Sequence, residues 1–253
     1  MRIIRFKTAS QPAQYGWISE DMVGIIHGDP FSEYRRFSPQ FPLAEVELLP
    51  PVLPGKILAV GRNYSEHIRE MQSERPEFPL LFLKPPSAVI YSGEPIVLPP
   101  QSQQVEHEAE LAVVIGKRSR WLRPDNVQAA IFGYMAANDV TARDLQKKDV
   151  QWARAKGFDT FCPLGPWIET EFDPSDALIT CHVNNTLRQM ASTRDMIFDV
   201  AQLLLFASSI MTLEPGDVLL TGTPAGVGPL TAGDVVSIHI DGIGSLTNPV
   251  QPA

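Results

Sequence analysis

A chain of 253 residues with a formal net charge of −8 is long enough for one large domain, or for one with a small appendage. The acidic balance argues against a nucleic-acid partner, because no basic surface is available to meet phosphates, but it allows a small anionic substrate. Two cysteines outside any Cys-x-x-Cys pattern, a charged N-terminus unlike a signal peptide and no apolar run long enough to cross a bilayer predict a cytoplasmic protein with no membrane partner.

The first residues predict a small group of strands. Residues 2–7 alternate between apolar and polar side chains, and residues 15–18 and 22–26 flank a polar turn like a hairpin. Residues 30–54 are rich in proline and show little periodicity, which predicts a connector. We therefore expect a small N-terminal β domain with its connector over residues 1–53 and a main domain over residues 54–253.

The main domain begins with an apolar run at residues 57–61, which predicts a buried strand that ends at a turn. Asn63 with Glu66 fits a capping box, so we expect a short helix to start there. On that helix His67 and Glu70 are three residues apart and share a face. The pair is either an ordinary exposed His–Glu pair, the more common case, or a histidine that a carboxylate makes basic enough to activate water.

Lys84 closes the next apolar run, residues 79–84, which predicts another buried strand. Its ammonium group either reaches the surface at the end of its methylene chain or points into a site. A further β pattern at residues 96–98 leads to the most informative segment of the chain.

That segment, residues 105–116, carries three alternating glutamates, which would point to one face of a strand: Glu106, Glu108 and Glu110. The same face continues with apolar residues, so the carboxylates would lie at the mouth of a buried region. Like charges on one strand face repel, and desolvation adds to the cost. A divalent cation would remove both problems, and oxygen ligands favour Mg²⁺, Mn²⁺ or Ca²⁺ over zinc. The alternative is a row of solvated strand carboxylates, which is common.

Asp139 ends the following apolar run and offers a further carboxylate, or a cap for a helix near Thr141. Residues 141–156 predict that helix, on which Arg143 and Gln146 either face a ligand beside Asp139 or belong to a solvated charged face. The next residues, 156–166, are rich in glycine, proline and aromatic side chains, which predicts an irregular loop packed over the interior.

The remaining third predicts strands around one core helix. Asp199 and Gln202 fit the cap of that helix, which carries an apolar stripe. A strand then leads into the glycine-rich residues 221–228, which lack the Gly-Lys-Ser/Thr of a phosphate loop but would bring the Thr223 hydroxyl close to a ligand. Hairpins are expected at residues 178–190 and 235–247. Many strands with few helices predict a mixed β-rich α+β fold, a roll or barrel rather than a doubly wound sheet.

Taken in order, these segments resemble the fumarylacetoacetate hydrolase superfamily, including its bacterial members similar to 2-hydroxyhepta-2,4-diene-1,7-dioate isomerase. The matching pieces are VGRNYSEHIRE (60–70), LFLKP (81–85), HEAELAVVIG (107–116), NDVTARDLQ (138–146), AKGFD (155–159) and LTGTPAGVG (220–228). The N-terminal residues also resemble the small domain that precedes this fold in many bacterial members. The resemblance implies a β-sandwich roll, a catalytic domain over residues 54–253 and usually a homodimer.

The resemblance also assigns roles to individual residues. It implies that Glu108, Glu110 and Asp139 bind Mg²⁺ or Mn²⁺, or Ca²⁺ in a crystal. His67 and Glu70 would form a catalytic dyad on a segment that acts as a lid, and Lys156 would be the active-site lysine. The residues expected to contact the substrate or the groups around the metal are Lys84, Arg143, Gln146 and Thr223. Glu106 is not a ligand in the family, so we expect it at the surface.

Members of the family act on small 2-oxo and 1,3-dicarbonyl acids. The resemblance implies hydrolysis of a carbon–carbon bond in an acylpyruvate or fumarylacetoacetate-like acid through a metal-stabilised enolate, with His67 taking a proton from water. Decarboxylation of oxaloacetate or 5-oxopent-3-ene-1,2,5-tricarboxylate, and isomerisation of 2-hydroxyhepta-2,4-diene-1,7-dioate in aromatic catabolism, use the same enolate. The dyad favours hydrolysis.

Two alternatives from other classes of protein remain at this point. One is a protein that binds a metal and an oxo acid without turnover, against which the dyad and Lys156 count. The other is a β-domain interaction protein. Residues 71–78 and 158–162 are the candidates for setting substrate identity.

Overall fold

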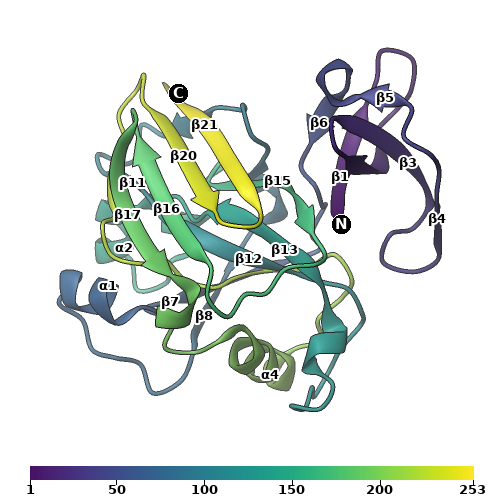
Figure 1. Cartoon of the computed structure of the whole chain (residues 1–253). Helices are drawn as coiled ribbons and strands as arrows, with labels where there is room; N and C mark the ends of the chain where they lie inside the picture. The colour runs from purple at the N-terminus through teal and green to yellow at the C-terminus, as the bar shows by residue number, and fades with distance from the viewer.

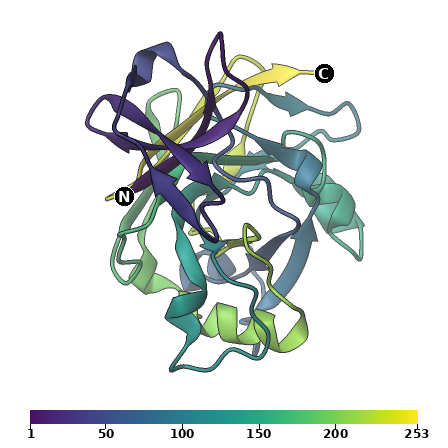
Figure 2. The ribbon, with the colours of Figure 1, turned by 90° about the vertical axis from the view of Figure 1, so that its right-hand side faces the viewer.

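The computed structural model describes residues 1–253, and strands make up most of its regular structure. The mixed β-rich α+β fold class is therefore confirmed. In Figure 1 the N-terminal strands lie to one side of a larger body, and both ribbon views place helix α4 (Val200–Ile210) at the end of that body away from them (Figures 1 and 2). None of the helices is long and apolar enough to span a membrane.

The largest sheet has 13 strands and runs from the N-terminal module through the main body in the order β4-β3-β2-β1-β15-β13-β12-β18-β7-β8. Three short strands, β5, β6 and β9, pair with members of this path. The strands are β1 (Arg2–Lys7), β2 (Gln14–Ser19), β3 (Met22–Gly28), β4 (Tyr34–Arg36), β5 (Phe41–Pro42), β6 (Glu47–Leu49), β7 (Ile57–Gly61), β8 (Leu80–Lys84), β9 (Val89–Ile90), β12 (Ala109–Ile115), β13 (Ile131–Asn138), β15 (Cys162–Glu169) and β18 (Val218–Leu220).

A five-stranded sheet of order β10-β21-β20-β16-β17 forms a second layer, and β14-β11-β19 forms a small third sheet. Their strands are β10 (Ile96–Leu98), β11 (Val105–His107), β14 (Thr141–Ala142), β16 (Leu178–Val183), β17 (Thr186–Ser192), β19 (Gly228–Pro229), β20 (Val235–Ile240) and β21 (Gly244–Pro252). The hairpins predicted for residues 178–190 and 235–247 correspond to β16–β17 and β20–β21.

Strand β12 is buried on both faces, which explains the unbroken apolar run of residues 111–115. Leu111 and Val113 belong to a core cluster of 34 buried residues shared with the five-stranded sheet and α4. Ala112 and Val114 point the other way, into a cluster of 15 buried residues that includes Ile3. Strand β12 therefore lies between these two clusters. The single strand predicted for the three glutamates is broken: Glu106 lies on β11, Glu110 on β12 and Glu108 between them.

The helices are short. They are α1 (Ser65–Glu70), α2 (Arg143–Lys148), α3 (Ala153–Lys156) and α4, with 3₁₀ turns η1 (Leu43–Glu45), η2 (Pro86–Ala88), η3 (Val127–Ala130) and η4 (Thr193–Asp195). The single helix predicted for residues 141–156 is wrong, because the segment forms β14, α2 and α3 in succession. A continuous helix would separate Arg143 and Lys156 by about 20 Å. Their side chains instead converge on Glu108.

Two further predictions failed in part. The predicted connector, residues 30–54, contains the short strands β4, β5 and β6. The loop predicted for residues 156–166 gives way at Cys162 to β15, which lies between β1 and β13. The Gly and Pro residues of this segment argued against a strand, yet β15 is paired on both sides.

The N-terminal strands have a small core of their own, formed by Ile4, Phe6, Ile18 and Val23. They join the main body where β1 pairs with β15, Arg2 opposite Glu169 and Ile3 opposite Ile168. We keep the division of the chain between residues 53 and 54 as a proposal.

Candidate active site

A cavity of about 250 Å³ is lined by residues from β7, α1, β8, β12, α2 and α3 and from loops beside these elements, including those after β13 and β18. Eight of the residues singled out from the sequence line it: His67, Glu108, Glu110, Asp139, Arg143, Gln146, Lys156 and Thr223. Residues to which the sequence assigned no role share the wall, among them Arg62, Phe82, Lys147 and Trp152. The cavity therefore gathers side chains from segments far apart in the sequence.

The three candidate metal ligands meet because β12 and β13 are antiparallel neighbours, with Ala109 opposite Asn138. Glu108 lies at the break between β11 and β12, and Asp139 directly follows β13. The Asp139 N–H donates to the Glu108 carbonyl at 2.9 Å, which ties the two positions together. One carboxylate oxygen each from Glu108, Glu110 and Asp139 lies within 4.8 Å of the others, and all three residues are buried.

Two lysines neutralise part of this charge. The Lys156 Nζ lies 2.7 Å from Glu108 Oε2 and 2.5 Å from Asp139 Oδ2. Burial alone would lower the pKa of Lys156, but the Asp139 and Glu108 charges raise it instead. The Lys84 Nζ lies beneath, 2.7 Å from Asp139 Oδ1, and donates to the Lys156 carbonyl at 2.6 Å. Lys84 does not line the cavity, so the structure places it behind Asp139.

Glu110 has no such cation. Its Oε2 accepts from the Gly222 N–H at 2.6 Å. Burial, followed by the Asp139 and Glu108 charges, raises the pKa of Glu110 well above its usual value. The set of three buried carboxylates therefore fits a divalent cation that prefers oxygen ligands, such as Mg²⁺ or Mn²⁺.

Arg143 is held by three acceptors. Its Nε donates to Glu106 at 2.7 Å, its Nη1 to Gln146 at 2.6 Å and its Nη2 to Glu108 at 2.5 Å. Although burial would raise the pKa of Glu108, Lys156 and Arg143 hold it well below its usual range. The expectation that Glu106 lies at the surface is wrong: its exposed fraction is 6%, because it is the buried counter-ion of Arg143.

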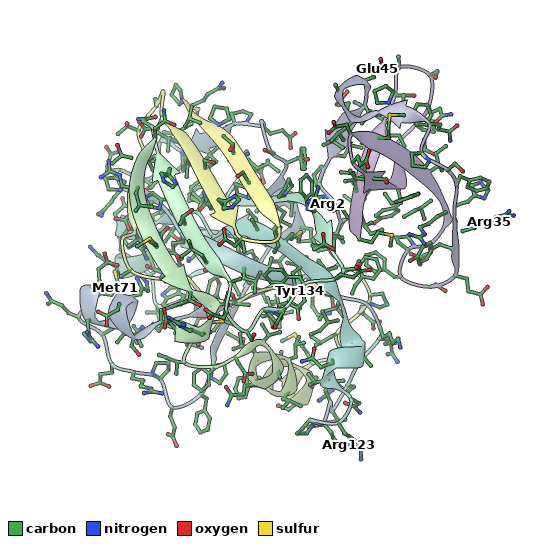
Figure 3. The ribbon with its side chains drawn as sticks, in the orientation of Figure 1. Arg2, Arg35, Glu45, Met71, Arg123 and Tyr134 are labelled. Atoms are coloured by element: carbon green, nitrogen blue, oxygen red, sulfur yellow. The ribbon has the colours of Figure 1, made fainter.

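The His67–Glu70 pair forms as the sequence predicted. The His67 Nδ1 lies 3.1 Å from Glu70 Oε2, and the Gly226 N–H donates to Glu70 Oε1 at 3.0 Å. His67 is buried and lines the cavity, so it is not the exposed histidine of the common case. Met71 follows at the end of α1, at the edge of the molecule in Figure 3.

The capping box predicted for Asn63 and Glu66 is wrong, because Tyr64 occupies the N-cap position without a side-chain cap. The Asn63 amide instead donates to the carbonyls of Phe198 and Thr221, and its oxygen accepts from the Phe198 N–H. Asn63 thus fixes the turn before α1 to two other segments.

Thr223 and Gln189 brace the first residue of β12. The Thr223 hydroxyl donates to the Ala109 carbonyl at 2.9 Å and accepts from Gln189 Nε2 at 2.8 Å. The Gln189 oxygen accepts from the Ala109 N–H at 3.0 Å. No sequence pattern indicated Gln189, which is the one fully buried residue of the otherwise mostly exposed strand β17. Of the two segments expected to set substrate identity, 71–78 contributes Met71 and Ser73 to the cavity and 158–162 contributes nothing.

Comparison with family models gives two matches. Residues 56–251 match the model described as fumarylacetoacetate (FAA) hydrolase C-terminal, and residues 1–51 match the model described as Rv2993c-like, N-terminal.

Known proteins resemble the chain closely. The crystal structure of 5-carboxymethyl-2-hydroxymuconate delta-isomerase from Mycobacterium smegmatis is 45% identical, with a TM-score of 0.94 and full coverage of both chains. Maleylpyruvate hydrolase from Sphingobium sp. SYK-6, in complex with manganese(II) and pyruvate, is 32% identical, with a TM-score of 0.82 and full coverage of both. The mitochondrial oxaloacetate tautomerase FAHD2B of Bos taurus is 42% identical over 225 residues, 84% of this chain and 72% of the relative.

Proposed function

The chain belongs to the fumarylacetoacetate hydrolase family, and from this premise we propose that it is a Mg²⁺- or Mn²⁺-dependent enzyme that hydrolyses a carbon–carbon bond in a small acylpyruvate-like acid. The observation that carries the proposal is the shared cavity. His67, oriented by Glu70, lines the same 250 Å³ space as the three carboxylates. The manganese and pyruvate held by the similar maleylpyruvate hydrolase support both the type of metal and the type of product.

In this proposal Glu108, Glu110 and Asp139 hold the cation. A divalent cation there would supply Lewis-acid chemistry, polarising the carboxylate and 2-oxo oxygens of the substrate and stabilising an enolate leaving group. Lys156 and Arg143, each ion-paired to Glu108, keep that carboxylate ionised and fixed in place. Lys84 holds Asp139 in place through an ion pair from behind the cavity wall.

His67 moves the proton. Because its Nδ1 faces Glu70, the imidazole carries its proton there and leaves Nε2 free as a base. Nε2 would take a proton from water, whose oxygen attacks the distal carbonyl carbon. The bond from that carbon to C3 then breaks, its electron pair stays on C3, and the proton on His67 passes to C3. The products are a carboxylic acid and pyruvate.

The test is pyruvate release from acetylpyruvate with Mg²⁺ and with EDTA, in the wild type and in His67→Ala. We expect Mg²⁺-dependent turnover that falls at least about 100-fold in the variant, since general base catalysis contributes about that much. Metal binding, measured by calorimetry, should stay unchanged in the variant. Full turnover by His67→Ala would refute the role of His67, and metal binding without any turnover would favour a binding protein.

A second candidate is proton transfer without hydrolysis, as in tautomerisation of oxaloacetate or isomerisation of a 2-hydroxydienoate. It is favoured by the names of two similar proteins, an oxaloacetate tautomerase at 42% identity and a delta-isomerase at 45%. Adding oxaloacetate to the same assay separates the reactions. Loss of the enol absorbance without pyruvate release indicates tautomerisation, and release of pyruvate from oxaloacetate indicates decarboxylation.

A further inference from the structure

One side chain of the five-stranded sheet reaches the strand that carries the candidate metal ligands. Gln189 lies on β17 and is fully buried, although the residues on either side of it are exposed. The register between β16 and β17 shifts at this point. Cys181 faces Gln189 and His182 faces Leu187, so Arg188 is an extra residue of β17. A bulge of this kind redirects the neighbouring side chains and is common beside active sites.

Every polar group of the Gln189 amide has a partner. Its Nε2 donates to the Thr223 hydroxyl at 2.8 Å and to the Pro224 carbonyl at 2.9 Å. Its Oε1 accepts from the Ala109 N–H at 3.0 Å and lies 2.9 Å from the His107 Nδ1. Because Pro224 offers only a carbonyl and Ala109 only an N–H, a single orientation of the amide satisfies them both.

Ala109 is the residue between two of the buried carboxylates, Glu108 and Glu110. Strand β18 does not reach this far along β12, so it offers no ladder partner to the Ala109 backbone. Side chains take its place, because Gln189 accepts from the Ala109 N–H and Thr223 donates to the Ala109 carbonyl. Gln189 therefore fixes the peptide group that joins Glu108 to Ala109.

The same part of β17 packs against the glycine-rich loop of residues 221–228. A Cβ at Gly226 would lie 2.1 Å from the Arg188 carbonyl oxygen, so only glycine permits this contact. Gly222 of the loop donates its N–H to Glu110 at 2.6 Å. Strand β17 thus supports the ligand strand and also the loop that holds one of its carboxylates.

We propose that Gln189 is a positioning residue that holds Glu108 and Glu110 in the fixed geometry that Mg²⁺ requires and Ca²⁺ does not. Gln189 does not line the cavity, so it acts through the residues it supports. Mg²⁺ demands a near-ideal octahedron of close oxygens, whereas Ca²⁺ accepts longer and more variable distances, so rigidity favours Mg²⁺. The inference rests on the proposed function for the presence of a cation at the three carboxylates.

The test is titration calorimetry with MgCl₂ and with CaCl₂ on the full chain, freed of metal by EDTA and dialysis. Gln189→Met keeps the length of the side chain and removes the amide. We expect the Kd for Mg²⁺ to rise about tenfold and the Kd for Ca²⁺ less than about threefold. Gln189→Asn has too short a side chain to reach both Ala109 and Thr223, so it should shift the ratio of the two Kd values in the same direction. It provides the same test if Gln189→Met does not fold.

Asn248→Leu is the matched control. Asn248 is a buried amide on β21 of the same sheet, and it donates to the carbonyls of Tyr91 and Glu94. None of these three residues lines the cavity. Its replacement leaves buried carbonyls without donors, as Gln189→Met does, so the melting temperature should fall by a comparable amount. Both metal affinities should stay within about twofold of the wild type, because the ligand strand keeps its supports.

The ratio of the two Kd values decides the outcome, since a general loss of stability would not change it. An unchanged ratio in both Gln189 variants would overturn the proposal, and so would an equal shift in Asn248→Leu. Either result together with Mg²⁺-dependent release of pyruvate by the wild type overturns only this inference. A wild type that binds neither ion would remove the proposed function, and this inference with it.

Discussion

At the scale of single residues, the three glutamates within residues 105–115 show that burial and ion pairing decide the role of each one. All three alternate along the chain, yet the structure uses them differently. Glu110 and Glu108 face the cavity, whereas Glu106 is the counter-ion of Arg143. Alternation indicated that the three residues were related, but it could not indicate that Arg143 of helix α2 would pair with both Glu106 and Glu108.

Replacing Glu106 therefore affects Arg143 first. In Glu106→Ala the buried Arg143 Nε loses its acceptor, and we expect the free energy of unfolding to fall by about 3 kcal/mol. Glu106→Gln retains an acceptor oxygen and should lose less. Urea unfolding of both variants measures the difference.

The control for this prediction is Glu66→Gln. Glu66 also pairs with an arginine, Arg69, but both side chains are exposed. We expect a change below about 0.5 kcal/mol there. Equal losses at the two sites would mean that the Glu106–Arg143 pair is no more than a surface ion pair.

At the scale of elements, most strands could be predicted from alternation and turn residues, and α4 from its cap and its apolar stripe. The Asp199–Gln202 capping box is present as predicted. The failures share a physical cause. Segment 141–156 is shaped by its ion pairs with Glu108, and strand β15 by pairing with β1 and β13. These partners are distant in the sequence, so local propensity does not predict them.

Asn63 and Asp199 give a paired test of this lesson. Asp199 is a true N-cap, so Asp199→Ala should cost about 1 kcal/mol of unfolding free energy. Asn63→Ala removes three hydrogen bonds and leaves backbone groups of Phe198 and Thr221 without partners, so we expect about 2–4 kcal/mol.

Chemical denaturation of both variants measures the two losses side by side. A loss at Asn63 no greater than at Asp199 would mean that the three hydrogen bonds of Asn63 contribute no more than a helix cap. Far-ultraviolet circular dichroism of the folded variants verifies that neither substitution removes the fold.

At the scale of the whole molecule, the candidate site is a meeting of segments rather than a local motif. The site forms only when both layers of the sandwich are packed, because its residues come from four separate segments: 62–70, 106–110, 139–156 and 223. From spacing alone, the glutamates could have been either metal ligands or a row of solvated carboxylates. The order of the motifs, through the family resemblance, indicated a single metal site.

Because the carboxylates are buried within the core, the charge of the site is coupled to the stability of the whole fold. Burial and the neighbouring carboxylates raise the pKa of Glu110 above 4.5, so without metal the folded state holds a proton that the unfolded state releases. Without metal, the contribution of Glu110 to the free energy of unfolding is therefore lost as the pH rises through its raised pKa. Glu108, lowered below its usual range, and Lys156, raised above 10.5, do not titrate between about pH 5 and 8.

His107 acts in the opposite direction. Burial lowers its pKa from 6.5, so its contribution to stability grows as pH rises, with or without metal. The His107 contribution is the same in Mg²⁺ and in EDTA, so it cancels when the two melting temperatures are subtracted. We expect that difference to increase from about pH 5 to about pH 8, because Mg²⁺ takes the place of the Glu110 proton and binds only to the folded state.

The variant Glu110→Gln tests whether the Glu110 carboxylate causes this pH dependence. The amide has about the same size and does not titrate, so with EDTA the variant should lose the destabilisation that Glu110 causes as pH rises. It should also gain little from Mg²⁺, since one of the three buried carboxylates is gone. A wild-type difference that stays flat with pH, or a variant that gains as much from Mg²⁺ as the wild type, would contradict a cation site built on Glu110. If the difference in melting temperature between Mg²⁺ and EDTA grows with pH in the wild type and vanishes in the variant, metal binding at Glu110 is coupled to folding.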